Sequence, residues 1–366
     1  MNVNKKSKAF TIVEIIVVVI VIGILASITV VSYGQVTKNA REKSVATDAA
    51  GMRAAIMKYK AEHGSYPTSL SQVADAPSTS STLQYSAIGS GYFCLAASTQ
   101  TISMYVSSVD SSPKSGTSTS CTPPDIQIVT TASCPTTRTV AKDARDNHTY
   151  WIQKLADGKC WMLTNLAYAG GGTNTYSDVM PTGDGTSGTL NNGTSETSTT
   201  YVNAKYYIPA GANPTTAPTE PSTSTDGGAT NPQYGYLYNW CAAMKAQTTT
   251  SACANASTPL PDTTTSICPA GWRLPTGGSS GEFKALNTTV NSGSTSSSSG
   301  LLGTWLAQYG GYWGGGFFNP GSDGYYWSST QGDSDYAYYL YFVSSYVNPS
   351  DGYDKNYGRA VRCLAL

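Results

Sequence analysis

The stretch FTIVEIIVVVIVIGILASITVV at residues 10–31 decides the fold of this 366-residue chain. Three lysines precede it, and a single carboxylate, Glu14, lies near its beginning. The apolar run Ile15–Val31 is about 26 Å long as a helix, and with residues 10–13 it is long enough to cross a hydrocarbon core of ~30 Å. The basic start predicts that the first residues stay on the cytoplasmic side of the membrane.

Glu14 is the unusual feature of this stretch. A carboxylate in a membrane segment costs about 2.5–3.5 kcal/mol, so its presence indicates a function. A secretory signal peptide also has a basic start and an apolar run, but it predicts no charge inside the run and removal of the whole stretch. We therefore favour a retained helix in which Glu14 has a role.

A Lys-rich leader, the small residue Ala9, and then Phe-Thr-Ile-Val-Glu opening an apolar helix together resemble the class III signal of type IV pilins and pseudopilins. The resemblance implies that a prepilin peptidase cleaves between Ala9 and Phe10, which removes the leader 1–9, and that the new Phe10 amine is methylated. Ala9 stands where the family usually has Gly. Since Glu14 lies one helical turn after Phe10, we expect Glu14 to neutralise the Phe10 amine of a neighbouring subunit in a filament.

The helix is predicted to continue beyond the membrane segment and to cover residues 10–63, with 10–31 as its transmembrane part. A 4-3-4-3 spacing of apolar residues predicts one buried stripe, formed by Val45, Ala49, Met52, Ile56 and Tyr59. We interpret the charges on the opposite face as solvated: Lys38, Arg41, Lys43, Arg53 and Lys58. Gly64 and Pro67 are the expected stop signals.

Residues 64–130 are predicted to form a small globular head, an antiparallel sheet packed on the helix. The chain has eight cysteines, which in an exported protein indicate disulfides. Spacing alone leaves about 105 connectivities open. By proximity we expect the pairs Cys94–Cys121 and Cys241–Cys253.

A second domain is predicted from residue 131 to 366, because all seven tryptophans lie between Trp151 and Trp327. Its recognisable strings are KCWMLTNLAY (159–168), YGYLYNW (234–240), CPAGWRLPT (268–276), YYWSST (325–330) and GRAVRC (358–363). This set resembles the FISUMP-type domain, which is related in pattern to C-type-lectin-like and formylglycine-generating-enzyme-like folds. The resemblance implies a Cys268–Cys363 disulfide, which leaves Cys134 and Cys160 as the remaining candidate pair.

Three local features of this domain can be predicted. Residues 282–286 read as the start of a short helix, with Phe283 and Leu286 facing inward. The string YAYYLYF at 336–342 predicts a strand, with Tyr336, Tyr338, Leu340 and Phe342 on one face. The tryptophans suit a loop-rich core in which indole N–H groups find backbone acceptors.

The composition argues against several classes of function. Lys+Arg and Asp+Glu are equal at 22 each, so no global positive field attracts nucleic acid and no nucleic-acid partner is expected. We expect no cofactor, with calcium as the one alternative, held by loop carboxylates of Asp323, Asp333, Asp335, Asp351 and Asp354. The string GGSSG at 277–281 matches a nucleophile motif around Ser279, with His148 as the only available base, and we interpret the match as chance.

The sequence thus predicts an α+β protein: a long N-terminal pilin helix packed on a small antiparallel sheet, then a loop-rich, disulfide-bonded C-type-lectin-like α+β domain. The expected function is that of a non-enzymatic subunit of a type IV pilus-like surface filament, whose C-terminal domain serves adhesion or surface contact. The expected partners are further copies of the chain, prepilin peptidase, the assembly machinery of the inner membrane, and host-cell or surface glycans or proteins. The chain would first cross the cytoplasmic membrane once and then join an extracellular filament. Two alternatives stay open: a minor pilin or pseudopilin of a secretion or DNA-uptake system, and a membrane-anchored enzyme.

Overall fold

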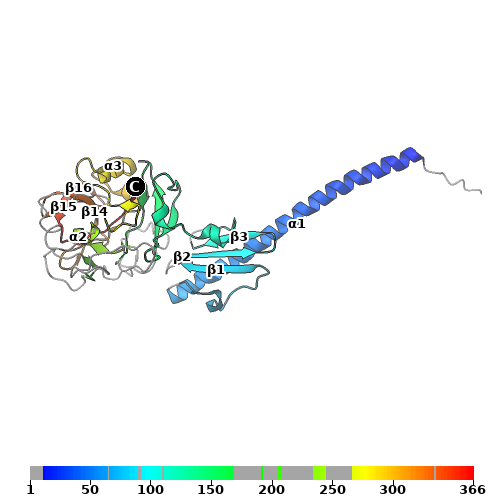
Figure 1. The fold of residues 1–366 in the computed structure, drawn as a ribbon, viewed down its shortest axis with the longest axis horizontal. Helices are drawn as coiled ribbons and strands as arrows, with labels where there is room; N and C mark the ends of the chain where they lie inside the picture. The colour runs from blue at the N-terminus through cyan, green and yellow to red at the C-terminus, as the bar shows by residue number, and fades with distance from the viewer. Residues whose placement is uncertain are drawn as a thin grey trace, which may run out of the picture.

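The computed structural model describes residues 11–64, 66–88, 92–108, 111–168, 191–192, 205–207, 234–244, 266–333 and 335–366. Figure 1 shows one long helix, a small sheet lying along its C-terminal half, and a larger domain on the far side of that sheet. The N-terminal half of the helix projects away from both.

Helix α1 spans Ile12–His63 and has 52 residues, which corresponds to a length of about 78 Å. It begins after the N-cap Thr11 and ends at Gly64, whose φ of 77° is left-handed and whose N–H donates to the carbonyl of Lys60. Glycine adopts this conformation without a steric penalty, so the predicted stop at Gly64 is confirmed.

The head is an antiparallel sheet in the order β1-β2-β3-β4. Its elements, with three short 3₁₀ helices, are η1 (Leu70–Gln72), β1 (Thr82–Ile88), β2 (Tyr92–Ser98), β3 (Ser103–Ser107), β4 (Lys114–Ser115), η2 (Ser118–Cys121) and η3 (Ile126–Ile128). The helix residues Val45, Ala49 and Ile56 are fully buried in one apolar cluster with Phe93 and Leu95 of β2. The predicted stripe therefore packs on the sheet from Val45 to Ile56, whereas Tyr59 is half-buried and stacks on His63 instead.

One residue of the predicted solvated face lies elsewhere. Arg53 donates from Nε to the carbonyl of Ser107 at 2.8 Å and from Nη2 to that of Ser108 at 3.0 Å. It follows Met52 of the buried stripe and reaches the end of β3, where backbone carbonyls accept its hydrogen bonds. The interpretation of Arg53 as solvated is wrong, whereas the other four charges of that face are exposed.

The C-terminal domain combines short sheets with short helices. A five-stranded sheet has the order β11-β17-β7-β6-β5, and a three-stranded sheet has the order β14-β15-β16. The strands are β5 (Thr139–Lys142), β6 (Thr149–Lys154), β7 (Cys160–Met162), β8 (Asn191–Asn192), β9 (Lys205–Tyr207), β10 (Leu237–Tyr238), β11 (Trp272–Arg273), β12 (Tyr312–Trp313), β13 (Phe317–Phe318), β14 (Gly324–Gln331), β15 (Tyr336–Val343), β16 (Tyr346–Asp354) and β17 (Leu364–Ala365). The helices are α2 (Trp240–Ala243), α3 (Glu282–Val290) and α4 (Ser299–Gly303). The predicted α+β class is confirmed.

Strand β15 lies where sequence analysis predicted it, and its side chains alternate as predicted. Leu340 and Phe342 join one apolar cluster, and Ala337 and Tyr339 join the other. On the predicted face of Leu340 and Phe342, Tyr336 is exposed and Tyr338 is half-buried. The pairing with β16 shifts register between Tyr339 and Tyr341, because β16 has one residue more than β15 in that interval.

Three buried tryptophans have the predicted backbone acceptors. The Nε1 atoms of Trp240, Trp272 and Trp327 donate to carbonyl oxygens at 2.9, 2.8 and 2.7 Å. The Nε1 atoms of Trp151 and Trp305 have no hydrogen-bond partner within the described part of the chain, so the prediction holds for some indoles only. The helix predicted at 282–286 is present as α3, with Phe283 and Leu286 fully buried.

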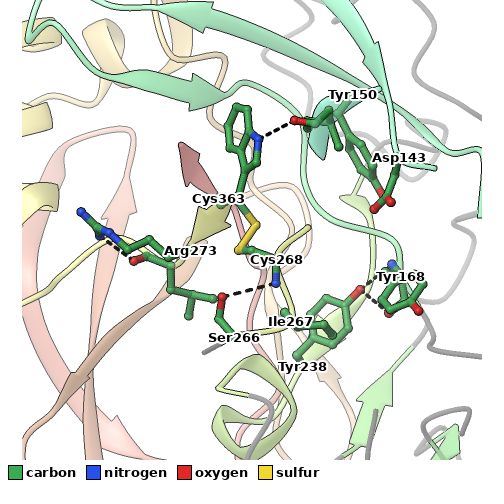
Figure 2. The surroundings of a disulfide bond; sticks show 12 residues. Asp143, Tyr150, Tyr168, Tyr238, Ser266, Ile267, Cys268, Arg273 and Cys363 are labelled. Carbon is green, nitrogen blue, oxygen red and sulfur yellow. Dashed lines mark hydrogen bonds between the residues drawn. A yellow bond between two sulfur atoms is a disulfide. The ribbon is translucent and has the colours of Figure 1, made fainter. Parts of the chain in front are cut away.

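Three disulfides have the predicted pairing: Cys94–Cys121, Cys134–Cys160 and Cys268–Cys363. Figure 2 shows the last of these, which ties the segment before β11 to the segment before β17. Cys241 is also disulfide-bonded. Its predicted partner Cys253 lies outside the described residues, so that pairing stays a prediction.

Glu282, at the start of α3, joins three segments of the C-terminal domain. Its carboxylate accepts from Nη1 and Nη2 of Arg273 at 2.6 and 2.7 Å, from Nζ of Lys159, and from the backbone N–H of Thr276 at 2.9 Å. Burial alone raises the pKa of Glu282, but the hydrogen bonds from Arg273, Lys159 and Thr276 outweigh it and lower the pKa to about 2. The ionised carboxylate is thus the form that the fold stabilises.

We expect the double substitution of Cys268 and Cys363 by Ser to destabilise the C-terminal domain by about 4–5 kcal/mol, because the disulfide closes a loop of 95 residues. Guanidinium unfolding followed by tryptophan fluorescence reports this domain specifically, since every tryptophan lies between Trp151 and Trp327. The same double substitution at Cys94 and Cys121 is the control, and it should leave the fluorescence transition in place. An unchanged midpoint in the Cys268 and Cys363 variant contradicts the prediction.

The low pKa of Glu282 predicts how stability depends on pH. Its folded pKa of about 2 lies below the ordinary value of 4.5, so its contribution, about 3 kcal/mol, is complete above pH ~4.5 and is lost as the pH falls towards 2. Glu282→Gln should therefore lower the free energy of unfolding at neutral pH and flatten its decline in acid. Denaturant unfolding at several pH values tests this prediction. If the free energy of unfolding of the wild type and of Glu282→Gln fell in parallel towards low pH, the prediction would be wrong.

Candidate functional site

The first turn of α1 contains a reciprocal pair of hydrogen bonds. The hydroxyl of Thr11 accepts from the backbone N–H of Glu14 at 3.2 Å. The Glu14 carboxylate accepts in return from the backbone N–H of Thr11 at 3.0 Å and from its hydroxyl at 2.9 Å. This arrangement is a capping box, which satisfies N–H groups that a helix start leaves unpaired.

The capping box directs the Glu14 carboxylate back to the backbone N–H and the hydroxyl of Thr11, at the start of the helix. The positive end of the helix dipole also favours a negative charge at this place. Ala9 and Phe10, the predicted processing residues, lie outside the described residues. The structure therefore shows where the Glu14 side chain lies, and the role of the Phe10 amine stays a prediction.

The N-terminal half of α1 exposes an apolar surface. Every large apolar side chain from Ile12 to Leu25 is between 47% and 79% exposed. Folded proteins rarely leave so large an apolar patch uncovered, and such patches mark interaction surfaces.

Sequence analysis predicts a membrane-spanning segment at residues 10–31. Within the described part of the chain, no helix combines the length and the apolarity that crossing a membrane requires.

Of the aspartates considered for calcium, Asp333, Asp335 and Asp354 lie near one another: the backbone N–H of Asp335 donates to Asp333 at 2.8 Å, and burial together with the charges of Asp335 and Asp333 raises the pKa of Asp354. The described residues contain no group of three or more His, Cys, Asp or Glu side chains placed to hold a metal ion. Asp323 and Asp351 accept hydrogen bonds from the hydroxyls of Tyr325 and Tyr339. Ser279 is exposed in the turn before α3.

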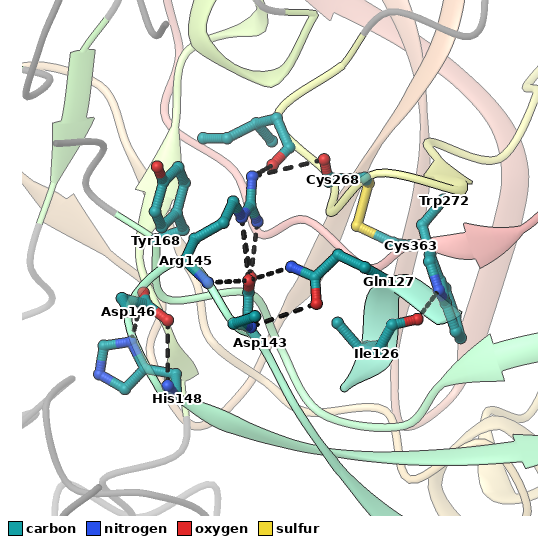
Figure 3. A network of polar contacts seen from close by, with 12 residues as sticks. Ile126, Gln127, Asp143, Arg145, Asp146, His148, Tyr168, Cys268, Trp272 and Cys363 are labelled. Carbon is teal, nitrogen blue, oxygen red and sulfur yellow. Dashed lines mark hydrogen bonds and ion pairs between the residues drawn. A yellow bond between two sulfur atoms is a disulfide. The ribbon is translucent and has the colours of Figure 1, made fainter. Parts of the chain in front are cut away.

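His148 belongs to a polar cluster that sequence analysis did not identify (Figure 3). Its Nδ1 lies 2.7 Å from the Asp146 carboxylate. Burial lowers the pKa of His148, but the hydrogen bond and the charge of Asp146 outweigh it, so the pKa is raised. This pairing gives His148 a structural role beside Asp146.

The centre of the same cluster is a fully buried ion pair. Arg145 donates from Nη2 to Asp143 at 2.7 Å, and from Nη1 to the carbonyl of Ile267 at 2.9 Å. Gln127 donates to Asp143 at 2.6 Å, and the guanidinium lies 3.7 Å from the ring centre of Tyr168. A buried pair with its remaining donors satisfied holds loops together, and its loss would leave an uncompensated charge. The only sign of it in the sequence is the short spacing between Asp143 and Arg145.

Comparison with known families gives two matches. Residues 4–30 match the prokaryotic N-terminal methylation motif, a range that includes Ala9, Phe10 and Glu14. Residues 306–364 match a domain of unknown function, DUF8237. The second match covers part of the predicted C-terminal domain and does not confirm the FISUMP-type assignment.

The chain is also similar to a fimbrial protein of Neisseria meningitidis serogroup A / serotype 4A. The two are 30% identical over 76 residues, which is 21% of this chain and 45% of the relative. The match thus spans less than half of the relative's length. The methylation motif at its N-terminus and this fimbrial similarity make the chain similar to type IV pilins and support a pilus subunit.

Proposed function

We propose that this chain is a structural subunit of a type IV pilus-like surface filament and that its C-terminal domain is displayed for adhesion or surface contact. The observation that carries the proposal is the division of α1 into two halves. The half that contains Val45 and Ile56 is covered by the sheet of the head, whereas the half from Ile12 to Leu25 is exposed. The methylation motif lies on the exposed half.

The exposed half requires apolar surroundings at every stage of the protein's life. Covering it with lipid, and then with the same helix of neighbouring subunits, removes apolar surface from water at about 25 cal/mol per Å². Prepilin peptidase and the inner-membrane assembly machinery are the partners that this sequence of events requires. Glu14 supplies the one charge on this surface, and pairing it with the Phe10 amine of a neighbour fixes the register of packing.

No chemistry is required of the C-terminal domain in this proposal. His148, the base that we considered for catalysis, has a structural partner in Asp146. Its displayed surface would instead make contacts with host-cell or surface molecules.

N-terminal mass spectrometry of filaments sheared from the cell surface tests the proposal. We expect a mature chain that begins at Phe10 and carries a methylated amine. A filament without the chain, or an exported product that begins beyond Val31, would contradict the proposal.

We expect Glu14→Ala to leave the chain in the membrane but to abolish its incorporation into filaments, because the helix loses the charge that sets the register. Glu42→Ala is the matched control, since Glu42 lies on the same helix and only its long contact to Lys38, at 3.9 Å, is lost. Immunoblots of the membrane fraction and of sheared filaments separate the two stages. Normal filaments from Glu14→Ala would refute the role of this residue.

A further inference from the structure

A small pocket lies on the sheet β14-β15-β16, where each strand contributes one tyrosine. Its volume is about 180 Å³, and its lining consists of Tyr312, Tyr325, Tyr339, Tyr353, Tyr357 and Arg359. Pockets for drug-sized molecules are larger, at roughly 300–1,000 Å³. This one has room for a single ring.

Arg359 is buried in the pocket, and two of its three guanidinium nitrogens have no polar partner among the described residues. The residue is 2% exposed, and its Nε and Nη1 atoms have no hydrogen-bond partner among the described residues. The guanidinium carbon lies 3.7 Å from the ring centre of Tyr339 and 4.8 Å from that of Trp327. These cation–π contacts offset part of the cost of burial, but they use none of the five N–H donors.

The other two buried arginines show how this domain ordinarily treats such a group. Arg362 donates from Nε to Asn165 at 2.7 Å, and from Nη1 and Nη2 to the carbonyls of Trp305 and Leu306 at 2.5 and 2.6 Å. Arg145 is paired with Asp143. Buried charges are paired as a rule, because an unpaired one costs several kcal/mol. Arg359 departs from the rule, and it lines a pocket.

The polar groups around Arg359 restrict what can complete the site. The hydroxyl of Tyr325 already donates to Asp323 at 2.9 Å, and that of Tyr339 to Asp351 at 2.7 Å. The guanidinium is therefore the strongest free donor in the lining, and it calls for an acceptor that carries charge. The two carboxylates behind the tyrosines would repel a second negative charge on the same ligand, which disfavours phosphate.

We propose that Arg359 and the surrounding tyrosines bind a single sugar ring that carries one carboxylate, such as a uronic or sialic acid residue at the end of a glycan. The carboxylate pairs with the guanidinium. The apolar face of the sugar packs on tyrosine rings, and their hydroxyl tips bond the sugar hydroxyls. This proposal names a ligand class for the surface-contact role proposed for the C-terminal domain, and it rests on that role.

The test uses the full chain, unassembled, in micelles of a detergent without a sugar headgroup. Methyl glucuronide and N-acetylneuraminic acid are titrated separately by calorimetry, beside methyl glucoside, which has the ring without the carboxylate. We expect an acidic sugar to bind. The glucoside should bind at least about tenfold more weakly, because it lacks the charged hydrogen bond. Whichever of the two acidic sugars binds more tightly shows whether the pocket takes a uronic or a sialic acid.

Variants at the rim provide the matched comparison. Tyr353 lines the pocket and is 44% exposed, whereas Tyr346 lies on the same strand outside the lining and is 45% exposed. Tyr353→Ala should weaken the binding of the acidic sugar, and Tyr346→Ala should leave it unchanged. Arg359→Met should abolish binding, with circular dichroism and tryptophan fluorescence as the check that the domain is folded.

Equal affinities for the glucuronide and the glucoside, or equal effects of the two tyrosine variants on binding, would refute the proposal that an acidic sugar binds in this pocket. Tighter binding of benzoate or inorganic phosphate than of either acidic sugar would overturn the sugar class. Because the chain is unassembled in this experiment, loss of filament formation does not affect the result, and absence of sugar binding leaves the filament role standing.

Discussion

The burial of helix α1 along only half of its length is the constraint on which the rest of the structure depends. From Val45 to Ile56 the helix is covered by β2 and β3, so the head is folded around its own segment of helix. From Ile12 to Leu25 the same helix has no cover. Since apolar surface is removed from water wherever possible, the two halves separate the interactions within a subunit from those between a subunit and its surroundings.

The C-terminal domain solves a different problem, because its regular elements are short and cannot bury a large surface one by one. Strand β15 lies between two apolar clusters, and the alternation of its side chains lets it contribute to both. Disulfides and buried ion pairs join the loops that the strands leave unconnected, as Arg145 does when it reaches the carbonyl of Ile267. Polar and covalent links thus complete a core that apolar packing alone would leave loose.

The sequence allows prediction of features that a local pattern determines. The spacing of Val45, Ala49 and Ile56 predicts the buried stripe, and Gly64 predicts the end of the helix. The alternation in 336–342 predicts which residues share a face of β15, but the bulge of β16 opposite Tyr339 and Tyr341 could not be predicted, because it depends on how the two strands pair. The position of Arg359 could not be predicted either: its surroundings come from β14, β15 and β16, and in the sequence it is only one of two arginines in GRAVRC.

The two ends of the described C-terminal domain lie side by side, since the N–H of Thr131 donates to the carbonyl of Leu366 at 3.3 Å. A pull on the surface of this domain therefore reaches the helix through the segment between Cys121 and Thr131 and through the apolar cluster in which Tyr92 and Cys94 of the head pack with Trp151. That segment begins at one disulfide, Cys94–Cys121, and leads three residues beyond Thr131 to another, Cys134–Cys160. Between the two bridges, the carbonyl of Ile126 accepts from Trp272 and Gln127 donates to Asp143, so the segment is itself anchored in the C-terminal domain. The covalent loops on both sides limit how far a force unravels the folded parts.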